Sequence, residues 1–298
     1  MQQPCATLAS AAFVSDVHLS ADDPATANAF LACLEALAGR VQALFVLGDL
    51  FDAWIGDDDS DAAFAAQVHS AFAGLTARGT RVLLMRGNRD FLLDAPLPAD
   101  EETGTGEPLG SGERAGANQQ AGGGRWPTGG RFSASCGSQM LADPSVISVA
   151  STRIAIAHGD ALCTDDADYQ RWRSMVRTDD WQREFLSRPL AERRQMAAAL
   201  RARSERSKRD KPQQIMDVNA DAVAALVRTE RVAHLVHGHT HRPGRHRLRL
   251  DGADCERWVL PDWDAAAGRG GALVVDALGW RTTDARGRPT DAIGKTTD

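Results

Sequence analysis

The 298-residue chain has no run of the roughly 18 to 20 uninterrupted apolar residues that a membrane-spanning helix needs, so we expect no bilayer crossing. It also has no Cys-x-x-Cys pair. Its five cysteines are scattered and odd in number, which predicts reduced packing residues rather than a disulfide framework. Basic residues are not in excess, because 34 Lys and Arg face 40 Asp and Glu, and the net charge of −6 argues against general nucleic-acid binding. What remains is ordinary globular composition, with 43% hydrophobic residues.

The amino-terminal segment carries no basic residues before its apolar stretch, which fits a secretory signal poorly. We therefore expect a cytoplasmic protein, with any membrane contact being peripheral.

Short apolar runs bounded by turn residues alternate with segments of helical period, a pattern typical of strands layered with helices. The predicted strands are residues 12–15, 43–47, 81–85, 153–157, 232–236, 257–260 and 272–276. Two stripes at helical spacing lie between the early strands and are interpreted as core rather than site: Phe30, Cys33, Leu34 and Leu37, then Phe64, Val68, Phe72 and Leu75. The fold class is α/β.

Two segments interrupt this alternation. Residues 100–131 contain ten glycines and few large apolar side chains, which predicts a disordered insertion, with a functional lid as the alternative. Residues 167–214 are helical in period and rich in arginine, which predicts a separate helical lid. The core is then residues 1–166 and 215–298.

Five predicted strands run into short loops that carry potential metal ligands. These ligands are Asp16 and His18, then Asp49, then Asn88, then His158, and finally His239 and His241. In layered α/β proteins ligands collect beyond the carboxyl ends of strands, so five such loops can converge. Glycines 48, 87, 159 and 238 let the backbone turn close to whatever is bound.

The residue types indicate the ion. Carboxylates, imidazoles and one amide oxygen, without thiolates, suit manganese, iron or zinc rather than a Cys-rich structural zinc. Six or seven ligands exceed one tetrahedral site and suit two metals that share a carboxylate, an arrangement that activates water for hydrolysis of a phosphate ester or anhydride. Each fragment alone, such as Asp-x-His, is an ordinary turn or strand pattern. The ordered combination favours a site.

These motifs, Asp16-x-His18, Gly48-Asp49-x-x-Asp52, Gly87-Asn88, His158 and Gly238-His239-x-His241, resemble the calcineurin-like metallophosphoesterase signature over about residues 13–243. The resemblance implies a layered αββα core. It also implies that one metal is held by Asp16, His18, Asp49 and His241, and the other by Asp49, Asn88, His158 and His239, with Asp49 as the bridge.

A narrower resemblance is carried by Arg89, which stands where most of the broad family has histidine, and by the strings GDLFDAWIGDD, GNRDFLL, HGDALCTDDADYQ, IMDVN and HGHTHRP. The chain is similar to the hydrolases of UDP-2,3-diacylglucosamine in bacterial lipid A biosynthesis. This implies attack of metal-bound water on the α phosphorus, giving UMP and 2,3-diacylglucosamine 1-phosphate (lipid X), with two Mn²⁺ per chain.

The same resemblance implies a monomer that lies peripherally on the cytoplasmic face of the inner membrane, binds a lipid-linked UDP-sugar and takes no nucleic acid. The implied catalytic residues are Asp49, Asn88, Arg89 and His239. The implied substrate contacts are Asn88, Arg89, Asp166, Ser204, Lys208, Lys211 and His239, where Lys208 replaces the family's usual asparagine. The long glycine-rich stretch is also a departure from the family, whose connection there is shorter.

Residues 171–211 contain thirteen basic and six acidic residues, interleaved with apolar side chains. Most of the arginines are read as a solvated helix face. The apolar set either packs the lid onto the core or lines a groove for acyl chains. Nearby, Asp52 is expected to orient a ligating histidine or to cap a helix, and residues 57–59 to form a solvated turn.

Two rival functions stay open on the sequence. One is a related phosphodiesterase acting on soluble nucleotides or nucleic acid, which the basic lid alone would allow. The other is a phosphoesterase fold that has lost its metals and serves as a binding scaffold, which the complete ligand set disfavours.

Overall fold

The protein is described by a computed structural model that covers residues 7–59, 63–97, 131–210, 217–290 and 296–297. Within α2, α6 and the last strand, the side chains of residues 63–64, 203–210 and 296–297 lie outside the description. The predicted insertion, residues 100–131, lies outside the described residues except for Arg131.

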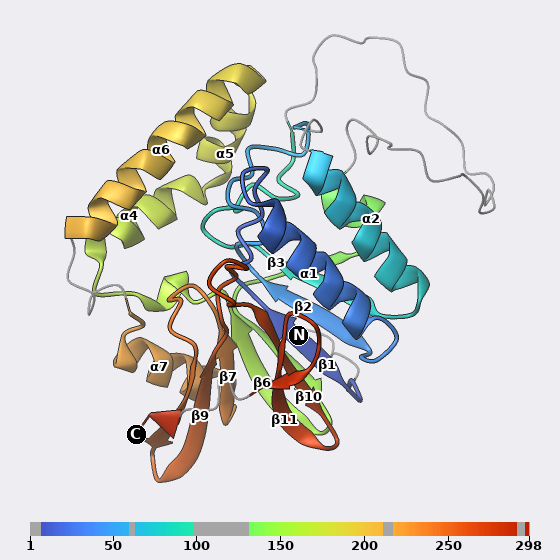
Figure 1. Ribbon diagram of the computed structural model, residues 1–298. Coiled ribbons are helices and arrows are strands. Elements are labelled where there is room, and N and C mark those ends of the chain that lie inside the picture. The colour runs from blue at the N-terminus through green and yellow to red at the C-terminus, as the bar shows by residue number, and fades with distance from the viewer. Residues whose placement is uncertain (1–6, 60–62, 98–130, 211–216, 291–295, 298) are drawn as a thin grey trace, which may run out of the picture.

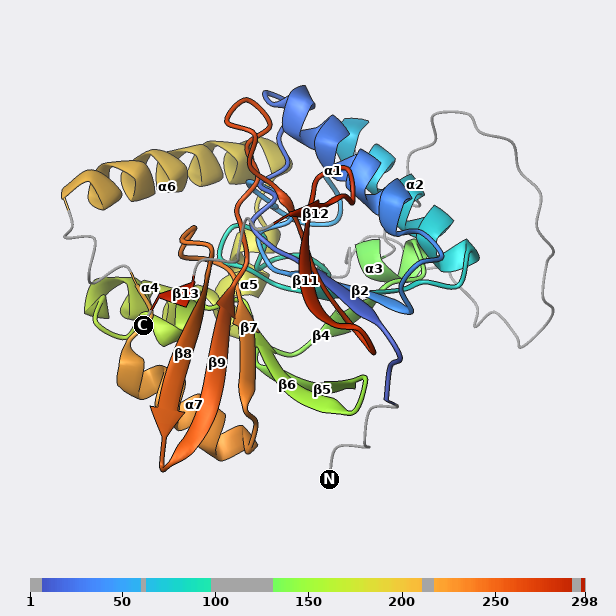
Figure 2. The ribbon, with the colours of Figure 1, turned by 60° about the horizontal axis from the view of Figure 1, so that its bottom comes forward.

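Two mixed β-sheets face each other (Figures 1 and 2). The first runs in the order β12 (Pro289–Thr290), β11 (Gly279–Asp284), β10 (Gly271–Asp276), β1 (Ala11–Val14), β2 (Ala43–Leu47), β3 (Arg81–Met85) and β4 (Gln139–Leu141). The second runs in the order β13 (Thr296–Thr297), β8 (Gly244–Leu250), β9 (Ala253–Val259), β7 (His234–His237), β6 (Thr152–Ala157) and β5 (Ser145–Val149). All seven predicted strands are confirmed, and their observed ends lie within a few residues of the predicted ends.

The alternation of side chains along β1 shows how the layers form. Ala11 and Phe13 point into the core between the sheets, whereas Ala12 and Val14 point to the outer face. That outer face is covered by α1 (Pro24–Leu37) and α2 (Ala63–Ala77). The second sheet is covered on its outer face by α7 (Ala220–Glu230). The order helix, sheet, sheet, helix confirms the predicted αββα layering.

The two predicted helical stripes belong to this core. Phe30, Cys33, Leu34 and Leu37 of α1 are buried, as are Val68, Phe72 and Leu75 of α2. The four described cysteines, Cys33, Cys136, Cys163 and Cys255, are buried and not bonded to one another, as expected of packing residues.

The arginine-rich segment forms three helices, α4 (Ala167–Val176), α5 (Asp179–Leu186) and α6 (Leu190–Asp210). They lie together at one end of the layered body in both views (Figures 1 and 2). Val176, Phe185 and Leu186 join the same hydrophobic cluster as α1 and α2. Two short elements, α3 (Phe132–Ser135) and the 3₁₀ turn η1 (Asp160–Leu162), complete the helices of the described chain.

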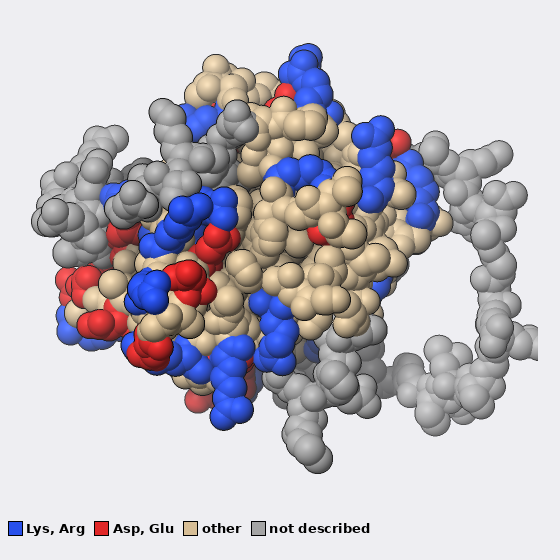
Figure 3. Space-filling view, turned by 90° about the horizontal axis from the view of Figure 1, so that it is seen from below, with Lys and Arg blue, Asp and Glu red and all other residues tan. Residues whose placement is uncertain are grey.

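Within the described ranges, every helix is either too short or too polar to span a bilayer. Basic and acidic side chains are interspersed on the face seen in Figure 3, with broad uncharged areas between them. This face therefore does not carry charge of a single sign.

Candidate active site

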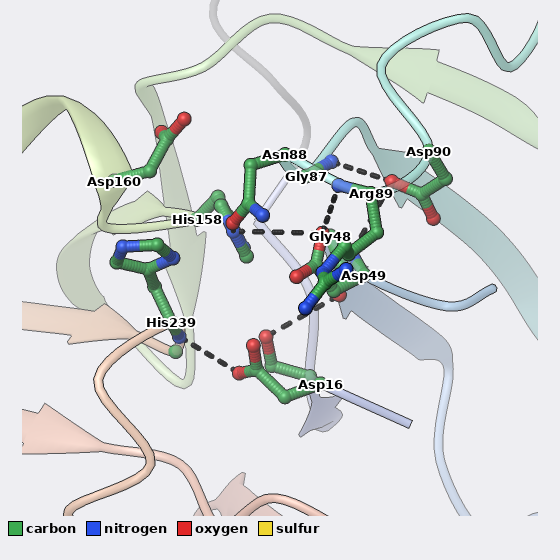
Figure 4. A network of polar contacts seen from close by, with 12 residues as sticks. Asp16, Gly48, Asp49, Gly87, Asn88, Arg89, Asp90, His158, Asp160 and His239 are labelled. Carbon is green, nitrogen blue, oxygen red and sulfur yellow. Dashed lines mark hydrogen bonds and ion pairs between the residues drawn. The ribbon is translucent and has the colours of Figure 1, made fainter. Parts of the chain in front are cut away.

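The predicted ligands lie where parallel strands end. Asp16 and His18 follow β1, Asp49 follows β2, Asn88 follows β3, His158 follows β6, and His239 and His241 follow β7. β1, β2 and β3 run parallel in one sheet, and β6 and β7 run parallel in the other. Their carboxyl ends therefore meet at one edge of the two sheets. Figure 4 shows the side chains that come from these loops gathered around one space, among them Asp16, Asp49, Asn88, His158 and His239.

Asp16, His18 and His241 form one candidate cation position. Their ligand atoms all lie within 4.8 Å of one another. Nε2 of His18 is 3.2 Å from Nε2 of His241, and Nε2 of His241 is 3.4 Å from Oδ1 of Asp16. Two imidazole nitrogens and a buried carboxylate oxygen facing a common point are donors that suit a borderline divalent cation.

Asp16, Asp49 and His158 form the second candidate position, and all three are buried. Nε2 of His158 lies 3.7 Å from Oδ1 of Asp49 and 3.1 Å from Oδ1 of Asn88. Nδ1 of the same ring contacts the carbonyl oxygen of Leu47 at 2.9 Å, which fixes the orientation of the ring.

Asp49 faces both positions. Its Oδ1 lies near Nε2 of His158, whereas its Oδ2 lies 3.8 Å from Nε2 of His18. A carboxylate whose two oxygens face two ligand groups has the geometry of a bridge. The structure thus brings together six of the seven predicted ligands.

The side chain of His239 stands slightly apart from these clusters. Its ring packs against that of His158, with centroids 5.1 Å apart, and its backbone N–H donates to Oδ2 of Asp16 at 2.8 Å. Among the described residues, its ring nitrogens belong to neither group of mutually close ligand atoms. The structure therefore places His239, the seventh predicted ligand, at the site, but its ring nitrogens are not grouped with the other ligand atoms.

Five of these residues have left-handed backbone conformations. Asp16, His18, Asp49, His239 and His241 have φ between 51° and 69°. Non-glycine residues rarely adopt such angles, and the conformation costs on the order of 1 to 3 kcal/mol each unless its surroundings enforce it. Their concentration in the loops after three strands, β1, β2 and β7, is typical of a functional site.

Two glycines allow the loops to approach so closely. A Cβ atom on Gly87 would lie 2.1 Å from Oδ1 of Asp49, and one on Gly238 would lie 2.2 Å from Oδ2 of Asp16. Both distances are far below van der Waals contact, so any side chain there would displace a predicted ligand. The interpretation of these glycines as close-approach positions is confirmed.

Burial and charge perturb the titration of the site. Burial alone would raise the pKa of Asp16, but its contact with His241 holds it well below its usual range. Burial would lower the pKa of His158, yet Asp49 and further carboxylates raise it to about 9. Burial lowers the pKa of His239 to about 3, so this ring is neutral, the form that can ligate a metal. The carboxylates that attract a proton to His158 would attract a cation in the same way.

A cavity of about 420 Å³ opens over these ligands. Its floor includes His18, Asp49, Asn88 and His239. A series of ring contacts, each 5.1–6.0 Å between centroids, leads away from the floor through His239, Tyr169, Trp172, Phe91, Trp181 and Phe185. The cavity thus joins a polar end to an apolar wall supplied mostly by α4 and α5.

The predicted substrate contacts divide into two groups. Asn88, Arg89, Asp166 and His239 line the cavity. The backbone N–H of Arg89 also donates to Oδ1 of Asp49 at 2.7 Å. The three others are not placed: Lys211 lies outside the described residues, and the side chains of Ser204 and Lys208 on α6 lie outside the description too.

Two carboxylates at the site had no predicted role. Asp90 is fully buried and accepts backbone N–H groups from Gly87 at 2.7 Å and from Leu50 at 2.8 Å, so it ties the β2 loop to the β3 loop. Asp160, also fully buried, is the partner of Tyr169, Arg173 and Arg177 of the α4 segment. Both follow a predicted ligand by two residues, in the strings Asn-Arg-Asp and His-Gly-Asp. This spacing is the sequence feature that could have indicated a role for them at the site.

The acidic residues of the 52–59 segment differ from expectation. Asp52 was expected to orient a histidine or cap a helix, but it pairs with Arg201 of α6. Residues 57–59 were expected to be a solvated turn, but Asp57 is buried and accepts N–H groups from Trp54 and Phe132. The other two carboxylates pair with successive arginines of α6, residues 193 and 194. The segment is therefore a docking point for α6.

Comparison with known proteins agrees with this geometry. A family model described as calcineurin-like phosphoesterase matches residues 10–243. The chain is 42% identical to a protein of Aromatoleum aromaticum named UDP-2,3-diacylglucosamine hydrolase, over 85% of this chain and 89% of the relative. Proteins of the same name from Bordetella pertussis and Chromobacterium violaceum are 42% and 40% identical, each over 91% of this chain and over 93% and 96% of the relative.

Proposed function

The chain belongs to the calcineurin-like phosphoesterase family, and from that membership we propose that it is the metal-dependent hydrolase of UDP-2,3-diacylglucosamine in lipid A biosynthesis. The reaction is hydrolysis of the pyrophosphate by attack of water on the α phosphorus. The products are UMP and 2,3-diacylglucosamine 1-phosphate.

Two divalent cations, Mn²⁺ in this proposal, would be held by the residues described above. The first is assigned to Asp16, His18, Asp49 and His241. The second is assigned to Asp49, Asn88, His158 and His239. The two oxygens of Asp49, which face His18 and His158, and the contact between His158 and Asn88 support this assignment. The donor groups Asp16, His18 and His241, and Asp16, Asp49 and His158, supply five of the assigned ligands. Bound there, the cations would lower the pKa of a water molecule and stabilise charge on a phosphoryl oxygen.

Three side chains that line the cavity are proposed to contact the substrate. Arg89, whose backbone is fixed on Asp49, directs a permanent positive charge into the cavity and stabilises charge that develops on the α phosphate. His239 is neutral and lies on the floor of the cavity, where it can contact a phosphate oxygen. Asp166 caps α4 by accepting the N–H of Tyr169 and is proposed to contact the sugar.

The two halves of the cavity match a diacylated sugar nucleotide. The polar floor suits its pyrophosphate, and the aromatic wall of Phe91, Trp172, Trp181 and Phe185 suits its acyl chains. We propose that residues 167–214 act as the lid over this cavity and that the core comprises residues 1–166 and 215–298. Ser204, Lys208 and Lys211 stay as proposed substrate contacts from the same segment.

The lid also supports peripheral contact with the cytoplasmic face of the inner membrane. Met175 and Arg171 of α4 and Arg183 of α5 are exposed, the arginines in pairs with Asp168 and Asp180. Exposed cations beside an apolar side chain suit an anionic lipid surface. Cosedimentation with anionic but not neutral vesicles would support this contact. A monomer, the proposed state, would show the mass of one chain by light scattering.

The observation that carries the proposal is the convergence of five strand-end loops on two donor clusters beneath an apolar wall. We test it by product analysis with UDP-2,3-diacylglucosamine, with and without Mn²⁺. UMP should form only with the metal. His18→Ala and Asn88→Ala should each lower kcat/KM by at least about 100-fold, since metal stabilisation amounts to several kcal/mol.

His69→Ala is the matched control, because His69 lies on α2 and contacts Ser135, away from the site. It should retain nearly full activity. Unchanged hydrolysis by both site variants in defined Mn²⁺ would refute the assignment. A preference for non-acylated nucleotides over the diacyl substrate would instead favour the rival phosphodiesterase.

A further inference from the structure

One buried carboxylate gathers three side chains of the α4 segment. Oδ2 of Asp160 accepts the hydroxyl of Tyr169 at 2.9 Å, Nε of Arg173 at 2.7 Å and Nη2 of Arg177 at 3.3 Å. Asp160 lies two residues after His158, in the loop that ends β6. The arginine-rich segment is therefore attached to the loop that carries one predicted metal ligand.

Arg177 makes a second contact that reaches another loop. Its Nη2 also donates to the carbonyl oxygen of Gly87 at 2.9 Å. Gly87 directly precedes Asn88, the predicted ligand from the β3 loop. One guanidinium group thus holds two loops that are about seventy residues apart in sequence.

The separation of those two loops sets the geometry of one cation position. Oδ1 of Asn88 and Nε2 of His158 are 3.1 Å apart, and each sits within two residues of a group that Arg177 contacts. Arg173 differs, because its ion pairs are with Asp160 and with Asp143. The donor fork of arginine is suited to hold two acceptors in fixed directions.

We propose that Arg177 is a positioning residue, which holds the Gly87–Asn88 loop and the His158–Asp160 loop at the spacing that the second cation position requires. Docking of α4 then completes that position. The first position, at Asp16, His18 and His241, does not depend on Arg177, since the contacts of Arg177 given above involve neither of its loops. This inference rests on the proposed function for the identity of the two positions.

The experiment is Mn²⁺ titration of metal-free protein, with free Mn²⁺ counted by its EPR signal. Wild type should bind two ions per chain. Arg177→Met should raise the Kd of one ion by about 10- to 100-fold, the usual effect of losing a residue that orients metal ligands, and leave the other unchanged. Arg177→Lys, which keeps a donor and the charge, should recover part of the affinity.

Arg183→Met is the matched control, since this arginine of α5 is exposed and pairs with the exposed Asp180. It should bind both ions as wild type does. Double variants identify the affected position. Arg177→Met should have its full effect in a His18→Ala background and no further effect in an Asn88→Ala background, where that position is already lost.

Wild-type affinity for both ions in Arg177→Met, or equal weakening of both positions, would overturn the proposal. If thermal unfolding shows that Arg177→Met does not fold, Arg177→Lys decides: weakening of one ion by threefold or more supports the proposal and no weakening overturns it. Wild type that binds two ions but leaves UDP-2,3-diacylglucosamine intact would defeat the proposed function alone. Wild type that binds one ion would defeat both.

Discussion

Replacing Gly87 by alanine tests whether close packing of the loops creates the site. The added Cβ would lie 2.1 Å from Oδ1 of Asp49 and 2.3 Å from its backbone nitrogen. Ordinary contact begins at 3.4 Å, so Asp49 or the β3 loop must move by about 1 Å. If Asp49 acts as proposed, a displacement of that size can cost about 100-fold in rate. Overpacking should also lower the free energy of unfolding by about 1 to 3 kcal/mol.

The assay is UMP release from UDP-2,3-diacylglucosamine at fixed Mn²⁺, together with urea unfolding. Gly74→Ala is the control, because a Cβ there meets only Nη2 of Arg78, at 3.9 Å, on the surface of α2. It should keep full activity and raise the free energy of unfolding by about 0.5 to 1 kcal/mol, the helix preference for alanine over glycine. A folded Gly87→Ala protein with kcat/KM within threefold of wild type would refute the argument.

Two further predictions concern the 52–59 segment. Arg193 is buried and donates to Asp58 and, at 2.6 Å, to the carbonyl oxygen of Ile55. Arg193→Met should therefore lower the free energy of unfolding, measured by urea titration, by about 2 to 4 kcal/mol. Arg194 is exposed, so Arg194→Met should lower it by at most about 1 kcal/mol. Similar losses for both would contradict this reasoning. Burial raises the pKa of Asp57 from 3.8 to about 6, so the folded protein binds a proton at this carboxyl group more tightly than the unfolded chain does. The contribution of Asp57 to the free energy of unfolding therefore falls as the pH rises from about 4 to 6. Asp57→Asn should remove that part of the pH dependence in unfolding experiments, and an unchanged profile would count against it.

Ion pairs link the arginine-rich segment, α4 to α6, to the layered body at two places. At one place, Arg173 of α4 and Arg177, which follows it, contact the loops after β6 and β3. At the second place, α6 contacts the 52–59 segment through Arg193, Arg194 and Arg201. The sequence favoured a solvated face for most of these arginines, and for Arg193 that reading is wrong, since its side chain is 3% exposed. The arginines thus act as cross-links between elements as well as surface charges.

One strand that the sequence missed, β8, shows why periodicity is insufficient. β8 reads Gly-Arg-His-Arg-Leu-Arg-Leu, which has no apolar run because charged residues alternate along it. Its pairing with β9, from Gly244 opposite Val259 to Leu250 opposite Ala253, supplies the backbone hydrogen bonds that periodicity cannot reveal. The buried strands were found because both of their faces are apolar, as in β2 and β3.

The sequence by itself determined the layered fold and six of the residues that cluster at the candidate site, because a strand end and the residue that follows it are local features of the chain. Tertiary structure alone decided which side chains fix those ligands in space. Asp57 meets Phe132 across 75 residues, Arg177 meets Gly87 across 90 and Arg193 meets Asp58 across 135. Sequence periodicity reports which face of an element is buried. It carries no information about which distant residue shares that burial, and the partner of a buried charge is set by how the elements pack.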